Sequence, residues 1–179
     1  MKATTNLPIG QSGIRWVWIA FVIVALDQLT KLWIQRSLDL YETIEVLPVL
    51  NIYHTFNRGA AWSMLENAGG WQRWMFSLLA LGVSVALLFW LRRLAVATQA
   101  LLVTGLLLIV GGAIGNLIDR LYLGHVVDFI QAHWGNAYFP SFNVADSAIS
   151  IGAALVIFDS LLESRREKRQ RAAAGEAGK

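Results

Sequence analysis

Four stretches of the sequence are apolar over the length that a membrane-spanning helix needs. A hydrocarbon core about 30 Å thick requires roughly 20 consecutive apolar residues of a helix. The four stretches cover residues 14–34, 71–91, 96–118 and 144–162. The chain is therefore expected to be an all-α membrane protein with four transmembrane helices.

The composition favours a bilayer over water as the solvent. Hydrophobic residues make up 56% of the chain, charged residues 15%, and the mean hydropathy is +0.50. Apolar residues usually account for about 45–50% of a soluble domain. The net charge is +3, but the basic residues lie between the apolar stretches, so no nucleic-acid partner is expected. Because the chain has no cysteine, a disulfide framework, a thiolate nucleophile and a cysteine-ligated metal site are excluded.

The first apolar stretch has the charged flank of a secretory signal peptide, since Lys2 and Arg15 precede it. The apolar run is longer than the roughly 7–15 residues of a signal-peptide core, and no small-residue cleavage pattern follows it. We interpret this stretch as a retained anchor.

The distribution of basic residues predicts the orientation of the four helices, because cytoplasmic flanks are enriched in Lys and Arg. One side would carry ten basic residues: Lys2, Arg15, Arg92, Arg93, Arg165, Arg166, Lys168, Arg169, Arg171 and Lys179. The other side would carry five: Lys31, Arg36, Arg58, Arg73 and Arg120. Both termini are therefore expected in the cytoplasm.

This orientation divides the chain into a cytoplasmic tail (1–13), a four-helix transmembrane domain (14–162) and a cytoplasmic basic tail (163–179). The domain includes two periplasmic segments, 37–70 and 121–142. Residues 169–179 are polar and small, and we expect them to be disordered.

The two outer segments contain patterns typical of strands. Residues 45–57 and 125–130 mix β-branched and aromatic side chains with polar ones, and the turn pair Gly135-Asn136 follows the second run. We expect a small sheet on the periplasmic face. Aromatic rings near the membrane boundaries can anchor it at headgroup level: Trp62, Trp71, Trp74, Trp134 and Tyr138.

Several ionisable residues fall inside or at the ends of the apolar stretches, where a charge costs about 2.5–3.5 kcal/mol. Asp27 and Lys31 are four residues apart and meet on one helical face. They are either a structural ion pair or a pair that positions a substrate or orders the outer sheet. Asp159, near the inner end of the fourth stretch, has no acidic partner close in sequence and is interpreted as a boundary residue.

The third stretch ends in a polar cluster. Asn116, Asp119 and Arg120 share a helical face through their spacing of three and four residues, and can hydrogen-bond as a cluster. Three polar groups exceed what one helix end needs. Gly111 and Gly115 form a small-xxx-small pair, which indicates close helix packing.

Two aspartates are predicted at the same membrane depth. Asp128 lies between apolar residues just before the fourth stretch, and Asp146 lies three residues after Asn143 at its start. Helix capping explains Asn143 and Asp146 on structural grounds alone. If the aspartates converge, they share one proton. The ionised member can then deprotonate water while the protonated member hydrogen-bonds the scissile carbonyl, help worth roughly 10²–10⁴ in rate.

Five short motifs occur in order along the chain: DQLTK at 27–31, NRGAAW at 57–62, GNLIDR at 115–120, VDF at 127–129 and FNVAD at 142–146. With these motifs the chain resembles the bacterial lipoprotein signal peptidases, also called signal peptidase II. The resemblance covers essentially all of the chain apart from its termini.

The resemblance implies an aspartic endopeptidase whose catalytic dyad is Asp128 and Asp146. Its substrate would be a prolipoprotein whose lipobox cysteine carries a diacylglyceryl group, cut on the amino side of that cysteine. Four residues would line the site and bind substrate: Asn57, Asn116, Arg120 and Asn143. Three further residues would support the site: Asp27, Lys31 and Asp119.

The resemblance also implies a multi-pass protein of the bacterial cytoplasmic (inner) membrane that contacts membrane lipids. Its active site would lie near the periplasmic face. No cofactor or metal is expected. A monomer is sufficient, because both aspartates belong to one chain.

Four other functions fit the sequence less well. A serine peptidase would use Ser63, Ser141, Ser147 or Ser150 with Lys31 as base, but no G-x-S-x-G frame surrounds them. A metal site would use the histidines at positions 54, 125 and 133, but no recognised ligand spacing occurs. A transporter or proton channel would need polar groups spread across the bilayer, whereas the middles of the second and third stretches lack charge. A purely structural subunit would leave the polar cluster at 116–120 without a function.

Overall fold

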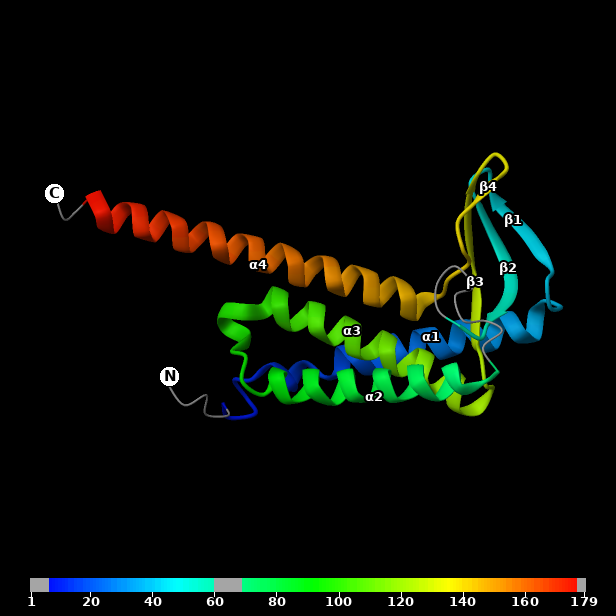
Figure 1. Ribbon diagram of the computed structural model, residues 1–179, viewed down its shortest axis with the longest axis horizontal. Coiled ribbons are helices and arrows are strands. Elements are labelled where there is room, and N and C mark those ends of the chain that lie inside the picture. Colours follow the sequence, from blue (N-terminus) through cyan, green and yellow to red (C-terminus); the bar gives the residue numbers. More distant parts are fainter. Residues whose placement is uncertain (1–6, 60–68, 177–179) are drawn as a thin grey trace.

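Four long helices form a bundle with a small sheet at one end. The computed structural model describes residues 7–59 and 69–176. A 3₁₀ helix, η1 (Gly13–Trp16), leads into α1 (Trp18–Ser37), and α2 (Trp71–Leu91), α3 (Val96–Tyr122) and α4 (Val144–Glu176) follow. The described N- and C-terminal ends both lie at the end of the bundle opposite the sheet (Figure 1).

The helices have the length and composition that crossing a membrane requires. The four candidate spans are Gly13–Ser37, Trp71–Leu91, Val96–Tyr122 and Val144–Arg171. This confirms the four predicted transmembrane helices, and the second matches its predicted range of 71–91. The first, third and fourth continue past their predicted ends, to Ser37, Tyr122 and Arg171.

The prediction of disorder in residues 169–179 is wrong for residues 169–176, which continue α4 to Glu176. The reason is local. Ala, Arg, Lys, Gln and Glu have high helix propensity, and this tail consists mostly of them. Arg171 and Glu167, four residues apart, also approach to 3.7 Å.

Helix α3 lies at the centre of the bundle. In its most apolar window 67% of residues are buried, against 17–22% in the other three spans. Glycines let its neighbours approach: a Cβ added at Gly111 would lie 2.8 Å from Cβ of Ile23 on α1, and one at Gly115 would lie 2.6 Å from Asp27 Oδ2. The predicted packing role of these two glycines is confirmed.

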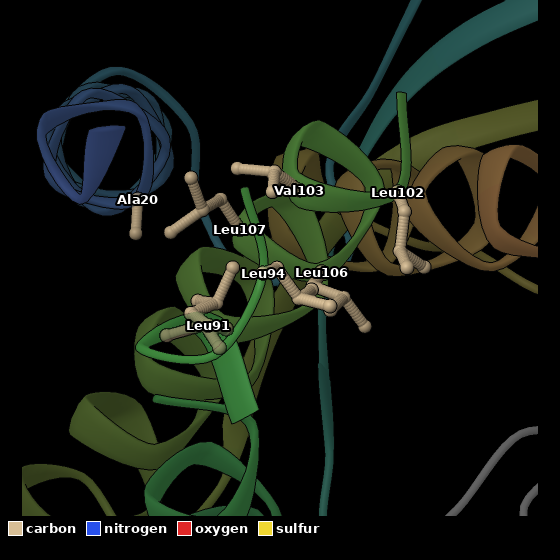
Figure 2. Close-up of a cluster of buried hydrophobic side chains, with 8 residues drawn as sticks. Ala20, Leu91, Leu94, Leu102, Val103, Leu106 and Leu107 are labelled. Atoms are coloured by element: carbon tan, nitrogen blue, oxygen red, sulfur yellow. The ribbon is translucent and has the colours of Figure 1, made fainter. Parts of the chain in front are cut away.

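The main hydrophobic core lies at the end of the bundle away from the sheet. Ala20 of α1 and Leu91 of α2 pack there with leucines and valines of α3 (Figure 2). A second cluster ties the sheet to the bundle, since Ile34 and Leu38 at the end of α1 pack against Phe129 of the sheet.

The sheet is antiparallel with strand order β1-β2-β3-β4. Its strands are β1 (Thr43–Leu47), β2 (Leu50–Asn57), β3 (Val126–Trp134) and β4 (Ala137–Tyr138). The predicted sheet layer and the turn at Gly135-Asn136 are confirmed. β1 is exposed along its whole length, whereas β3 begins with four buried residues, 126–129, where it meets the bundle.

Four of the five aromatic rings predicted to anchor the sheet are exposed. Trp71 and Trp74 lie in the first turn of α2, and Trp134 and Tyr138 lie in the β3–β4 hairpin, all exposed. Trp62 lies outside the described residues. Their anchoring at headgroup level stays a prediction.

Candidate active site

A pocket of about 1050 Å³ opens between the sheet and the adjoining ends of α3 and α4. Five of the six predicted catalytic and substrate-binding residues line it: Asn57, Asn116, Arg120, Asp128 and Asp146. The sixth, Asn143, is fully buried and lies behind the pocket wall. Residues from four separate segments of sequence therefore converge at one place.

Asp128 is positioned by the buried start of β3. It pairs with Thr55 of β2 and is only 3% exposed. Its Oδ1 accepts a hydrogen bond from Asn143 Nδ2 at 2.8 Å, and its carboxyl also hydrogen-bonds the Asn57 side chain. Asp128 is therefore a nearly dry carboxyl held by two amides.

Asp146 lies in the first turn of α4 and forms a reciprocal cap with Asn143. The Asp146 backbone N–H donates to Asn143 Oδ1 at 2.9 Å, and the Asn143 N–H donates to Asp146 Oδ2 at 3.3 Å. Asp146 Oδ1 accepts a further bond from Asn116 Nδ2 at 2.7 Å. The predicted capping role of these residues is confirmed, and the cap holds the Asp146 carboxylate at the pocket.

Burial and, after it, the negative charge of Asp146 raise the pKa of Asp128 to about 7. The Lys31 ammonium and the hydrogen bonds from Asn57 and Asn143 oppose this rise. The two aspartates thus interact electrostatically across the pocket, as their predicted convergence requires. A carboxyl with this pKa is poised to hold or release a proton near neutral pH.

A buried ionic cluster lies beneath the two aspartates. Lys31 Nζ is 2.8 Å from both Asp27 Oδ2 and Asp119 Oδ2. Asp27 Oδ1 accepts from the Ala145 N–H at 2.9 Å, and Asp119 Oδ2 accepts from the Val127 N–H at 3.1 Å. The cluster ties α1, α3, α4 and β3 together, which explains why ionisable groups are tolerated there.

The sequence correctly predicted that Asp27 and Lys31 meet, but it did not reveal the second acid, Asp119. The predicted cluster of residues 116, 119 and 120 is also arranged differently, because Lys31 links Asn116 to Asp119. Sequence reasoning missed Gln28, whose Nε2 donates to Asp119 Oδ1 at 2.9 Å. Its only signal was a polar side chain next to Asp27 in an apolar stretch.

Arg120 borders the pocket at the end of α3. Its guanidinium lies over the Phe76 ring, 5.2 Å from the centroid, and its Nη2 lies 3.4 Å from the Gly59 carbonyl oxygen. It interacts electrostatically with Asp146 and Asp128. Arg120 therefore places a positive charge beside the two carboxyls.

The sheet forms one wall of the pocket, and this wall contains residues that were not predicted from the sequence. Tyr53 and Thr55 line it together with Asn57, at alternate positions of β2, and Phe56 lines it as well. Side chains at alternate strand positions point to the same face. The period of two was therefore the signal that extends the site from Asn57 along the strand.

This geometry belongs to a known family. Residues 19–162 match the family model described as Signal peptidase (SPase) II. The chain belongs to the signal peptidase II family. It is thus a peptidase, and its four apolar helices are those of a multi-pass membrane protein.

Relatives of this signal peptidase II chain resemble it over nearly its full length. The lipoprotein signal peptidase of Shewanella pealeana is 48% identical over 158 residues, covering 88% of this chain and 92% of the relative. That of Shewanella amazonensis is 47% identical over 159 residues, covering 89% and 94%. A bacterial membrane enzyme solved by the in meso method at 2.3 Å has a TM-score of 0.74 at 34% identity, covering 85% of this chain and 90% of that one.

The lysine that a serine mechanism would use as its base, Lys31, is not free in this signal peptidase II chain. Ser141, Ser147 and Ser150 line the pocket, and the Ser147 hydroxyl donates to the Asn143 carbonyl at 2.9 Å. The Lys31 ammonium is instead occupied by two carboxylates and an amide. Ser63 lies outside the described residues.

Within residues 7–59 and 69–176, no group of three or more His, Asp or Glu side chains is arranged to hold a metal ion. His54 Nδ1 lies 3.0 Å from the Leu38 carbonyl oxygen. Burial, and then the charge of Arg58, lowers the pKa of His125. These two histidines thus have ordinary structural surroundings.

Proposed function

We propose that this chain is a membrane-embedded aspartic endopeptidase that removes the signal peptide from diacylglyceryl-modified prolipoproteins, cleaving on the amino side of the lipidated cysteine. The observation that carries the proposal is the Asn143 side chain, which hydrogen-bonds both Asp128 and Asp146. Membership of the signal peptidase II family and the names of the lipoprotein signal peptidases that it resembles support the substrate.

In this mechanism Asp146 is the base and Asp128 the acid. Asp146 accepts two N–H bonds and lies near Arg120, which favours its ionised form. Burial and the Asp146 charge raise the pKa of Asp128 to about 7, so it can carry a proton at neutral pH.

Asp146 takes a proton from water as the water oxygen attacks the scissile carbonyl carbon, while Asp128 hydrogen-bonds the carbonyl oxygen. Collapse of the tetrahedral intermediate breaks the C–N bond. The amine of the cysteine leaves with a proton from the dyad.

Of the four residues predicted to bind substrate, we assign direct contact to Asn57 and Arg120, which form the wall of the pocket. Asn143 is fully buried, and Asn116 is committed to Lys31 and Asp146. We assign both to holding the aspartates rather than to gripping the peptide.

The lipid of the substrate would lie against α4. Ile149 and Ile151 line the pocket on that side, and Ile151 is 55% exposed on the outer surface of the bundle. An apolar opening towards the bilayer allows acyl chains to stay in hydrocarbon while the peptide reaches the aspartates.

The test is cleavage of a diacylglyceryl-modified precursor by purified protein, with Asp128→Asn and Asp146→Asn compared with wild type. Each variant should lose nearly all turnover. The matched control is Asp159→Asn, which removes a carboxylate elsewhere on α4 and should leave the rate unchanged. A folded Asp128→Asn or Asp146→Asn protein with near-normal turnover would rule out the dyad.

The role of the lipid is tested separately with a precursor of identical sequence that lacks the diacylglyceryl group. We expect this precursor to be cleaved poorly, because the apolar part of its binding energy is missing. Equal rates on the two substrates would remove the lipid from the proposal.

We also propose that both termini face the cytoplasm, that the membrane is the cell inner membrane, and that the monomer is active. The absence of cysteine permits a direct test in cells. Asn136→Cys in the β3–β4 turn should react with a membrane-impermeant thiol reagent added outside, and Ser164→Cys near the inner end of α4 should not. The reverse pattern would invert the orientation.

A further inference from the structure

The Asn116 side-chain amide can adopt two orientations, and only one of them places a hydrogen-bond donor against Asp146. One end of an amide donates hydrogen bonds and the other accepts them. In the structure Asn116 Nδ2 donates to Asp146 Oδ1 at 2.7 Å, and Asn116 Oδ1 points away from the aspartate. With the amide turned around, its oxygen would face the carboxylate and repel it.

Lys31 fixes this orientation. Its ammonium has three hydrogens and no acceptor, and three oxygens surround it: Asp27 Oδ2 at 2.8 Å, Asp119 Oδ2 at 2.8 Å and Asn116 Oδ1 at 2.9 Å. An atom that faces Lys31 must therefore be an oxygen. The Asn116 nitrogen is left to face Asp146.

The Asn116 side-chain oxygen also determines the orientation of the Asn143 amide. Asn143 Nδ2 donates to Asn116 Oδ1 at 3.1 Å and to Asp128 Oδ1 at 2.8 Å, while Asn143 Oδ1 accepts from the Asp146 N–H. The orientation of Asn143 therefore follows from that of Asn116. One ammonium determines which atoms both aspartates meet.

We propose that Lys31 is a positioning residue for the two aspartates, acting through Asn116 so that the Asn116 and Asn143 amides each donate a hydrogen bond to one carboxyl. Asp27 and Asp119 hold the ammonium in place. This inference rests on the proposed aspartic mechanism and adds a role to a cluster that otherwise only joins helices.

The burial of the cluster supports a role beyond helix packing. The Lys31 side chain is 3% exposed and Asp27 is 0% exposed. A buried ion pair is seldom worth its desolvation for stability alone, and here two acids surround one lysine. The third lysine hydrogen is directed at the amide that touches Asp146.

Loss of the ammonium has a specific expected consequence. The Asn116 amide can then turn, so the ionised Asp146 loses its 2.7 Å donor part of the time. Turnover should fall, and the acidic limb of the pH profile of kcat should move to higher pH, because ionisation of the base becomes less favourable. KM should change little, because Asn57 and Arg120 still form the pocket wall.

The test uses a charge-compensated variant, because Lys31 substituted alone would leave two carboxylates unpaired in the protein interior. The variant is Lys31→Met combined with Asp27→Asn and Asp119→Asn, and its control is Asp27→Asn alone, which keeps the lysine paired with Asp119, so that the cluster has no net charge in either protein. Relative to this control we expect kcat to fall by about tenfold or more and the acidic limb to move up. An unchanged kcat, together with an unchanged acidic limb of its pH profile, would overturn the inference.

A second comparison separates positioning from the direct electrostatic influence of Lys31 on the dyad. Both proteins are also made with Asn116→Ala. If Lys31 acts through Asn116, removing the lysine from the Asn116→Ala protein has little further effect on kcat or on the acidic limb of the pH profile. An effect as large as that with Asn116 present would contradict the inference.

Lys31→Arg gives an independent check if the compensated variant does not fold. It keeps the charge and has only donors, so the acidic limb should stay at its wild-type position even if stability falls. A shift of the limb in a folded Lys31→Arg protein would also overturn the inference. Asp128→Asn is included throughout: if it is inactive while Lys31 has no effect, the mechanism stands and only the positioning role fails.

Discussion

Asn143 donates a 2.8 Å hydrogen bond from Nδ2 to Oδ1 of Asp128, while its backbone N–H and side-chain oxygen cap Asp146. One buried residue at the start of α4 thus holds a carboxyl from the sheet and a carboxyl from a helix. This arrangement makes the two aspartates one unit.

Asn143→Ala should therefore impair both activity and stability. Loss of the helix cap should cost about 1 kcal/mol of unfolding free energy, and loss of the bond to Asp128 should lower kcat by about tenfold or more. Thermal unfolding and steady-state kinetics measure the two effects. Asn136→Ala, the same change in the exposed turn after β3, should alter neither, and a wild-type kcat for Asn143→Ala would show that this bridge is dispensable.

The pKa of Asp128, raised to about 7 by burial and by Asp146, predicts the alkaline limb of the pH profile. Above pH 7 the dyad loses the proton that Asp128 supplies, so kcat should fall by up to tenfold per pH unit. Kinetics on the lipid-modified precursor between pH 5 and 9 provide the measurement. A kcat that keeps rising to pH 9 would be inconsistent with Asp128 as the acid.

The same pKa has a consequence for stability, with a definite sign. Because the folded-state pKa lies above the ordinary value of 3.8, protonation of Asp128 favours the folded state. This contribution is fully present below about pH 4 and is lost as the pH rises through about 7. In Asp128→Asn it should be absent, so the variant should lose less stability than wild type between pH 4 and 7.

Gly111→Ala should destabilise the bundle, because the new Cβ would lie 2.8 Å from Cβ of Ile23 on α1. Overpacking of this kind costs about 1–3 kcal/mol. Gly82→Ala on α2 is the matched control, since nothing lies within 4 Å of its added Cβ. Thermal unfolding in detergent should show a lower midpoint for the first variant only. Equal midpoints would mean that α1 and α3 tolerate a wider separation.

Ile151→Ser should weaken binding of the lipid-modified precursor, because Ile151 lines the pocket on the bilayer side. We expect a higher KM with little change in kcat. Ile157→Ser is the control, as Ile157 is similarly exposed on α4 but lies away from the pocket. Equal KM values for the two variants would place the acyl chains elsewhere.

The helices were predictable because each is a continuous apolar stretch of the sequence. The strands were predictable from β-branched and aromatic residues and from the turn at Gly135. The extension of α4 to Glu176 was not predicted, because the polarity of its last residues is typical of disorder, whereas the helix propensity of its alanines and charged residues favours a helix.

The site was only partly predictable, because its key contacts join different helices. The spacing of Asp27 and Lys31 revealed their pairing within α1, but no local pattern shows that Lys31 also reaches Asp119 and Asn116 of α3. These contacts depend on how closely the two helices pack at Gly111 and Gly115. The orientation of the Asn116 and Asn143 amides depends in turn on Lys31.

The most direct measurement of the central claim is the turnover of a diacylglyceryl-modified precursor by Asp128→Asn, Asp146→Asn and the variant carrying both changes. If the aspartates act as one unit, each single variant should lose nearly all activity, and the double variant should lose little more. Near-normal turnover by either single variant, or losses that multiply in the double variant, would contradict the dyad.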